Sequence, residues 1–264
     1  LKASAQTSTL LAHYDFNKIT GTAVPDVTGN GYDGVLDGSD YSVNEESVSF
    51  NEKSDSNYGS GVKLNKNVFA DTSDEVTIMA WVKPSTSESE NAIRTFFNLN
   101  IGATSNQSNY ALWITKFSGQ GLRYLNACAI QTDAILKSNQ WNLITIVQNN
   151  TANYMYLNDT LVAAFESGQR LCDIPNGVVT FAKAITWPDK GFKGAVDDIK
   201  IYSEAFNELE VAQEYQKTMY PISGFSVGGY NAAIDQKSKT MLISLPENFS
   251  LENVSPIVTT TASE

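Results

Sequence analysis

The chain has 264 residues, with 18 Lys and Arg against 29 Asp and Glu, and a formal net charge of −11. Such a surface repels phosphate backbones, so nucleic acid is not expected as a partner. No apolar run approaches the roughly 20 residues of a membrane helix, so no membrane-spanning segment is expected. Hydrophobic residues make up 42% of the chain. Its length allows one large β domain and a smaller one.

Strand patterns recur through most of the chain. Residues 10–16 alternate, with Leu10, Ala12, Tyr14 and Phe16 on one face. Residues 76–82 are apolar on both faces, as in the middle of a layered sheet. Further strands are predicted at 93–99, 110–117, 122–130, 141–148, 154–157, 161–165, 178–181 and 192–202. A hairpin is predicted to turn at Asn158-Asp159.

The last quarter of the chain changes character. One helix is predicted to start at Asn207, with Glu210 as the reciprocal capping residue and an apolar stripe of Leu209, Ala212 and Tyr215. Three alternating runs follow, the last two joined by a polar turn at 235–239. This β module of about 45 residues is small for a core of its own. The predicted divisions are an extension at 1–9, a main domain at 10–219 and this module at 222–264.

Four segments in order carry a family resemblance: residues 10–38, 76–84 (VTIMAWVKP), 140–165 and 192–216. Over residues 8–218 the chain resembles the laminin G-like domain of the concanavalin A-like lectin/glucanase superfamily, in its secreted bacterial form. The resemblance implies an all-β, two-sheet antiparallel jelly-roll sandwich with a short helix near residue 210. It also implies structural calcium and glycan binding more often than catalysis. The tail resembles the opening half of an immunoglobulin-like module.

The loop "PDVTGNGYDGVLD" at residues 25–37 is the first candidate site. Oxygen-bearing side chains at Asp26, Thr28 and Asn30 precede Gly31, and Asp37 closes a spacing like that of an EF-hand. An aspartate at the last position and the lack of flanking helices argue against an EF-hand proper. The loop can instead be a turn that Asp26 and Asn30 shape.

The laminin G-like resemblance implies a cation between this loop, the end of the first strand and the last long strand. Alternation places Asp197 on the face of Ile199 and Ile201, where a buried carboxylate needs a partner. The predicted calcium ligands are Asp197, Asp26, Asn17, and backbone carbonyls near Asn30 and Gly31. In the alternative, Asp197 accepts backbone N–H bonds and no metal binds.

Sugar recognition needs an open aromatic face with polar groups around it. Trp187 lies in a loop with proline and glycine (AITWPDKGF) and is the first candidate, followed by Tyr32 and Trp113. Trp81 and Trp141 are predicted to pack in the core or on a sheet face. His13 is predicted to be a strand histidine with its hydrogen bonds satisfied.

Catalysis lacks a signature here. The glucanase pattern of alternating carboxylates (Glu-x-Asp-x-(x)-Glu) is absent from the sequence, so the chain leans away from an enzyme. Three functions stay open: a glycan-binding domain with a polysaccharide or glycan as partner, a glycoside hydrolase or lyase, and a protein-binding adhesion module. A secreted, periplasmic or cell-surface location is expected, with a signal or lipid anchor already removed. Cys128 and Cys172 can be bonded or free.

Overall fold

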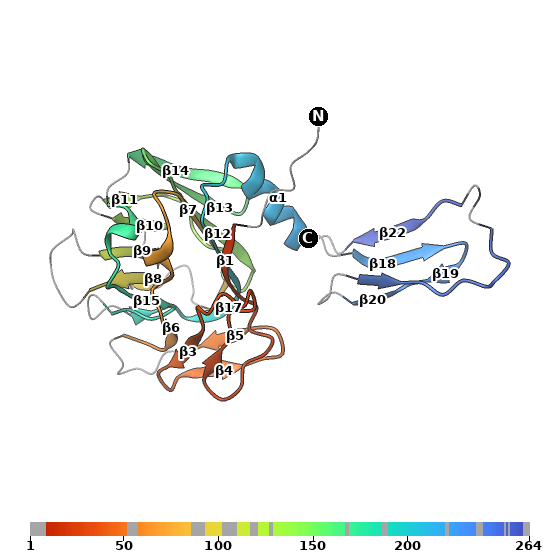
Figure 1. Cartoon of the computed structure of the whole chain (residues 1–264), viewed down its shortest axis with the longest axis horizontal. Coiled ribbons are helices and arrows are strands. Elements are labelled where there is room, and N and C mark those ends of the chain that lie inside the picture. Colours follow the sequence, from red (N-terminus) through yellow and green to blue (C-terminus); the bar gives the residue numbers. More distant parts are fainter. Residues whose placement is uncertain are drawn as a thin grey trace. The chain divides into compact units, whose positions relative to one another are not determined.

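The computed structural model describes residues 9–51, 58–85, 93–101, 110–116, 121–126, 129–166, 169–185, 190–219, 222–235, 240–250, 252 and 254–260. The chain divides into two compact units, Leu1–Glu208 and Leu209–Glu264. The first unit is built from two main antiparallel sheets (Figure 1). The predicted two-sheet sandwich is therefore confirmed for this unit.

Sheet A has the strand order β14-β13-β12-β7-β17-β5-β4, and β1 also pairs with β17. Its strands are β1 (Leu10–Tyr14), β4 (Tyr41–Val43), β5 (Val48–Phe50), β7 (Val76–Pro84), β12 (Asn142–Gln148), β13 (Ala152–Leu157), β14 (Thr160–Glu166) and β17 (Gly194–Tyr202). The hairpin of β13 and β14 turns at Asn158 and Asp159, as predicted, with Asn158 at φ 59°.

Sheet B has the order β11-β10-β9-β8-β15-β6-β3-β2, and β16 pairs in parallel with β8. Its strands are β2 (Ala23–Val24), β3 (Gly34–Asp37), β6 (Gly61–Leu64), β8 (Arg94–Asn100), β9 (Tyr110–Lys116), β10 (Arg123–Asn126), β11 (Ala129–Gln131), β15 (Val178–Phe181) and β16 (Lys190–Gly191). Two 3-10 turns, η1 (Val68–Asp71) and η3 (Leu171–Asp173), complete this unit, and Cys172 in η3 is a free thiol. Cys128 lies outside the described residues.

The core lies between the two sheets. All residues of β7 but Lys83 are buried, which confirms the prediction that residues 76–82 lie in the middle of a sheet, and every residue of β12 is buried as well. The alternate residues Ile78, Ala80 and Val82 of β7 contribute to the core, together with rings such as Phe50, Phe97 and Phe181. Burial of these apolar side chains supplies the main driving force for folding.

Two strand predictions need correction. Residues 122–130 form two strands, because β10 and β11 fold back on each other with Arg123 opposite Gln131. The segment between residues 23 and 64 also holds five strands, β2 to β6, that the sequence did not predict. Each has only two to four residues, which is too short for a period of two to stand out.

Strand β17 carries an irregularity that decides the site geometry. Its register against β7 shifts between Asp197 and Lys200, and Asp198 has a φ of 49°. An extra residue at a bulge reverses the alternation, so Val196 and Ile199 both face the core. Asp197 is therefore on the opposite face, and the prediction that it shares a face with Ile199 and Ile201 is wrong. At this point β17 also exchanges its edge partner, from β5 (194–196) to β1 (199–202).

The second unit contains helix α1 (Glu208–Met219) and the strands β18 (Ile222–Val227), β19 (Tyr230–Asn231), β20 (Ala233–Asp235), β21 (Thr240–Leu242) and β22 (Ile257–Thr260). The helix begins directly after Asn207, as predicted. The predicted stripe is wrong at Leu209, which is 66% exposed, whereas Val211 is buried. From residue 224 on, none of the residues whose burial is described is buried. An immunoglobulin-like identity for this module stays a prediction. None of the described helices has the length and hydropathy to span a membrane.

Gly194 opens β17 in a conformation that only glycine adopts readily. Its φ is +143°, and an added Cβ would lie 2.2 Å from the Lys83 carbonyl oxygen and 2.8 Å from the Pro84 Cα. Gly29, at φ +79°, has nothing within 4 Å of such a Cβ. We expect Gly194→Ala to lower the free energy of unfolding by about 3 kcal/mol or more, because backbone atoms must move. Gly29→Ala should cost only about 1 kcal/mol for its dihedral angle. Denaturant melts of both variants test this, and equal losses would contradict the packing described here.

Candidate functional site

His13 on β1 connects the two regions that the sequence singled out. Its backbone N–H donates to Asp26 Oδ1 at 3.1 Å, and its carbonyl accepts from the Val27 N–H at 2.9 Å. Its imidazole Nε2 lies 2.5 Å from Asp198 Oδ1. The prediction of a strand histidine with satisfied hydrogen bonds is confirmed. Strand β1 therefore lies between the opening loop on one edge and β17 on the other.

Asp26 organises the opening loop from inside. It is 6% exposed, and its Oδ1 accepts from the Thr28 N–H and hydroxyl at 3.1 and 2.7 Å, besides His13. Its Oδ2 accepts from the Tyr32 N–H at 3.3 Å, and its own N–H donates to Asp33 Oδ1 at 2.8 Å. A carboxylate with several N–H donors is an anchor for a turn. The interpretation of Asp26 as a turn-shaping residue fits these bonds.

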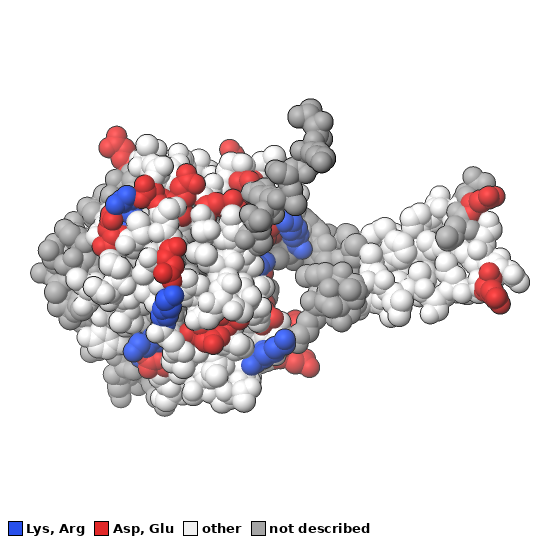
Figure 2. Space-filling model, viewed as in Figure 1, with Lys and Arg blue, Asp and Glu red and all other residues white. Residues whose placement is uncertain are grey.

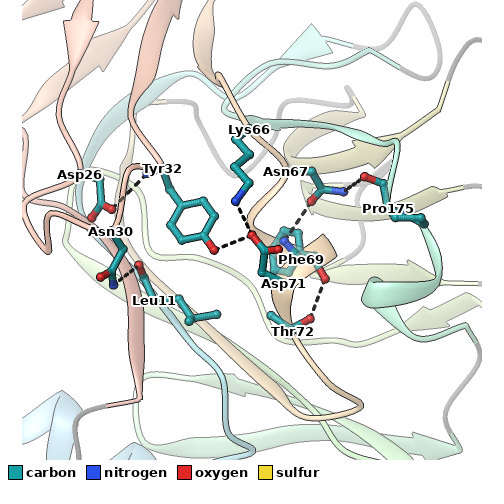
Figure 3. Close-up of polar contacts among 10 residues, drawn as sticks. All are labelled: Leu11, Asp26, Asn30, Tyr32, Lys66, Asn67, Phe69, Asp71, Thr72 and Pro175. Carbon is teal, nitrogen blue, oxygen red and sulfur yellow. Dashed lines mark hydrogen bonds and ion pairs between the residues drawn. The ribbon is translucent and has the colours of Figure 1, made fainter.

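Asn30 faces two consecutive carbonyl groups of β1. Its Nδ2 donates to Leu11 O at 2.9 Å (Figure 3). It also donates to Leu10 O at 3.4 Å, and the Thr28 hydroxyl donates to Leu11 O at 3.2 Å. Successive carbonyls of a regular strand point to opposite edges. Here the β1–β17 register shifts between Leu10 and Ala12, and this bulge lets both carbonyls meet Asn30. The result is a small group of oxygen atoms at the edge of β1.

Asp197 and Asp198 have opposite electrostatic environments. Burial, then the charge of Asp198, and after these the charges of Glu46 and Asp15 raise the pKa of Asp197 to about 7, although a hydrogen bond from the Asp198 N–H lowers it. For Asp198, burial is outweighed by the hydrogen bond with His13 and by Lys200, whose Nζ lies 2.9 Å from Oδ2, so its pKa falls to about 2. Asp198 therefore keeps its negative charge, whereas Asp197 takes up a proton as the pH falls below about 7.

The structure does not gather the predicted calcium ligands at one point. Asp26, Asn30 and Gly31 lie on one edge of β1, whereas Asp197 belongs to β17 beyond the other edge. Asn17 follows β1, and its N–H donates to Asp15 Oδ1. Within the described ranges, no three His, Cys, Asp or Glu side chains converge as a metal cluster would. Calcium itself stays a prediction.

Tyr32 lies inside the structure. It is 6% exposed, its hydroxyl donates to Asp71 Oδ2 at 2.7 Å, and Lys66 Nζ lies 4.9 Å from its ring centroid (Figure 3). Burial and then the hydrogen bond with Asp71 raise its pKa to about 12. The expectation of an open ring at the loop tip is wrong.

The tryptophans divide differently from the prediction. Trp187 and the side chain of Trp113 lie outside the described residues, although the Trp113 backbone pairs between the core residues Phe97 and Tyr124. Trp81 is 7% exposed, as expected, but Trp141 is 38% exposed. The only sequence signal for the exposure of Trp141 is its position directly before β12, where the strand pattern starts. Trp141 was therefore missed as a candidate.

Comparison with protein families decides the assignment. Residues 55–212, more than half of the chain, match a laminin G-type family model described as the concanavalin A-like lectin/glucanases superfamily. The chain belongs to this superfamily. A comparison with curated proteins finds no match.

Solved structures of this superfamily's fold resemble the chain at low identity. Domain 4 of AbnA, a GH43 extracellular arabinanase from Geobacillus stearothermophilus in complex with arabinotriose, is 19% identical with a TM-score of 0.60, covering 78% of this chain and 98% of that domain. A Trypanosoma rangeli sialidase is 13% identical (TM-score 0.60, 81% of this chain), but the chain spans only 34% of it. The binding domain of botulinum neurotoxin DC in complex with rat synaptotagmin II is 13% identical, with a TM-score of 0.60. The match covers 86% of this chain and 60% of that one.

The raised pKa of Asp197 makes stability depend on pH. Its folded pKa of about 7 exceeds the ordinary 3.8, so the native state binds more protons than the unfolded chain between these values. Stability should fall as pH rises from about 4 to 7, by an amount on the order of a few kcal/mol. Asp197→Asn should remove most of this slope and raise stability at pH 8, whereas the exposed Asp133→Asn should not. Thermal melts in chelator across this pH range test it, and an unchanged slope in Asp197→Asn would contradict it.

Proposed function

We propose that the chain is a non-catalytic glycan-binding domain of a secreted, periplasmic or surface-anchored bacterial protein. The observation that carries the proposal is the match over almost the whole length of an arabinanase domain whose structure holds arabinotriose. The superfamily membership supports it, because this fold hosts lectins. Function on a shared fold depends on the site, so the proposal must be tested on this chain.

The arrangement of carboxylates favours binding over hydrolysis. A glycosidase needs two carboxyl groups that face each other across the sugar, roughly 5 to 9 Å apart. Asp197 and Asp198, the carboxylates with the most strongly shifted pKa values, are sequence neighbours at a bulge. Asp198 is already engaged by His13 and Lys200. This pair suits a structural role at the junction of β1, β5 and β17.

We also propose that a structural calcium ion binds at the opening loop. The carbonyls of Leu10 and Leu11, the Thr28 hydroxyl and the Asn30 amide offer only oxygen ligands once the amide rotates to present Oδ1. Such a set fits Ca²⁺ in chemistry, and Asp26 supplies the negative charge beside it. The ion would tie the loop to β1. The acidic surroundings of Asp197 offer an alternative position.

A glycan array with and without calcium tests the binding function. We expect retention of at least one class of oligosaccharide and no release of product on prolonged incubation. Product release would establish a hydrolase or lyase instead. Silence across the array would contradict glycan binding and would favour a protein-binding adhesion module.

Calcium binding should be visible as a rise in melting temperature, because a ligand that binds only the native state stabilises it by mass action. We expect the wild-type protein to gain several degrees in millimolar Ca²⁺ relative to chelator. Asn30→Ala should lose this gain, and Asp197→Asn should keep it. The reverse result would move the ion to Asp197, and no gain in the wild type would contradict calcium binding.

A further inference from the structure

The outer face of sheet A points away from the core, and at one end it is covered by other parts of the chain. Met79, Trp81 and Leu143 are buried there although none belongs to the core cluster between the sheets. The segment after β17 folds over this end: the Phe206 N–H donates to the Thr77 hydroxyl at 2.9 Å, and the Phe206 ring lies 4.4 Å from that of Tyr202. This end of the face is therefore a packed layer.

The other end of the same face is open, and its residues form a row across five strands. Lys83 of β7 lies opposite Ala195 of β17, and Ala195 lies opposite Ser49 of β5, which in turn lies opposite Ser42 of β4. Asn142 pairs with Val82, so the β12 register continues with Trp141 opposite Lys83. None of these five residues is buried. Five adjacent strands span about 19 Å, given the usual strand spacing of ~4.8 Å.

The row contains the kinds of side chain that bind sugars. Trp141, 38% exposed, presents an indole at one end. In the middle of the row, Ala195 and Ser49 have short side chains, and we call this low part of the surface the floor. Lys83 supplies a donor, and the Asn44 amide, which donates to Ser49 Oγ at 3.0 Å, borders the floor on the far side. Stacking on an aromatic ring combined with a few polar groups is how proteins bind such ligands.

Resting on the proposed glycan function, we propose that this row is the glycan-binding surface and that it takes a neutral oligosaccharide lying across the strands. The charges favour a neutral ligand. Asp197, two residues beyond Ala195 on the same face of β17, places a carboxyl group beside the row. Acidic side chains are spread over the visible face of the molecule in Figure 2, and the net charge is −11. A uronic or sialic acid would meet this negative field, which Lys83 alone does not offset.

The test is binding of neutral and acidic oligosaccharides to the full chain by calorimetry, after the array has identified a ligand. Trp141→Ala should weaken binding at least tenfold, and Ala195→Arg should block it by filling the floor. The matched controls Tyr58→Ala and Tyr230→Ala remove aromatic rings that are 46% and 40% exposed elsewhere, and should bind like the wild type. Circular dichroism melts show whether each variant folds.

The outcomes separate this surface from the function as a whole. A wild-type protein that binds no glycan would overturn the proposed function. Wild-type binding that survives in both Trp141→Ala and Ala195→Arg would overturn this surface and leave glycan binding in place. Loss of binding in Trp187→Ala, with Trp141→Ala unaffected, would also overturn it and place the sugar at Trp187. A preference for acidic ligands would overturn the neutral class.

Discussion

The contact between His13 and Asp198 fixes the candidate site, because it joins β1 and the opening loop to the bulge of β17. Asp198 occupies a positive φ at the bulge of β17, a conformation that costs a non-glycine residue free energy. The imidazole of His13 and the ammonium group of Lys200 hold its carboxylate there. His13 also fixes the opening loop through its backbone bonds with Asp26 and Val27. One residue thus connects the loop, β1 and the bulge.

The bulge has two consequences for the surface. It turns Asp197 away from the core onto the outer face of sheet A. Partial burial there, beside other carboxylates, raises the pKa of Asp197. At the bulge the pairing of β17 with β5 also ends and its pairing with β1 starts. The outer face of sheet A is covered differently on the two sides of this point. On one side the face is packed under the segment of Phe206. On the other side short side chains and an exposed indole leave it open.

The sequence predicted the fold well where strands are long and apolar. Strand β7 is apolar on both faces over residues 76–82, and its place in the middle of a sheet was predicted from this pattern; β12, with seven buried residues, was predicted as a strand. The short strands β2 to β6 have no such pattern, since their pairing depends on neighbours distant in sequence. The bulge was missed because alternation was assumed through the whole of GAVDDIKIY, although two adjacent aspartates separate the apolar residues Val196 and Ile199. The face of Asp197 was therefore assigned wrongly.

The candidate site was less predictable, because exposure depends on tertiary contacts. Tyr32 looked open at a loop tip, but Asp71 comes from a 3-10 turn 39 positions away and closes over its hydroxyl. Trp141 looked like the first residue of a buried strand, but it lies at the end of the sheet where nothing covers it fully. Local patterns indicate which face a residue takes. They do not indicate what covers that face.

An NMR titration with the identified oligosaccharide, followed on the indole N–H signals of the four tryptophans, tests whether a glycan lies across the row from Trp141 to Ser42. Each signal is assigned by a single Trp→Phe variant. We expect the Trp141 indole signal to shift strongly with ligand while those of Trp113 and Trp187 stay in place. A shift confined to Trp113 or Trp187, with Trp141 unchanged, would contradict it.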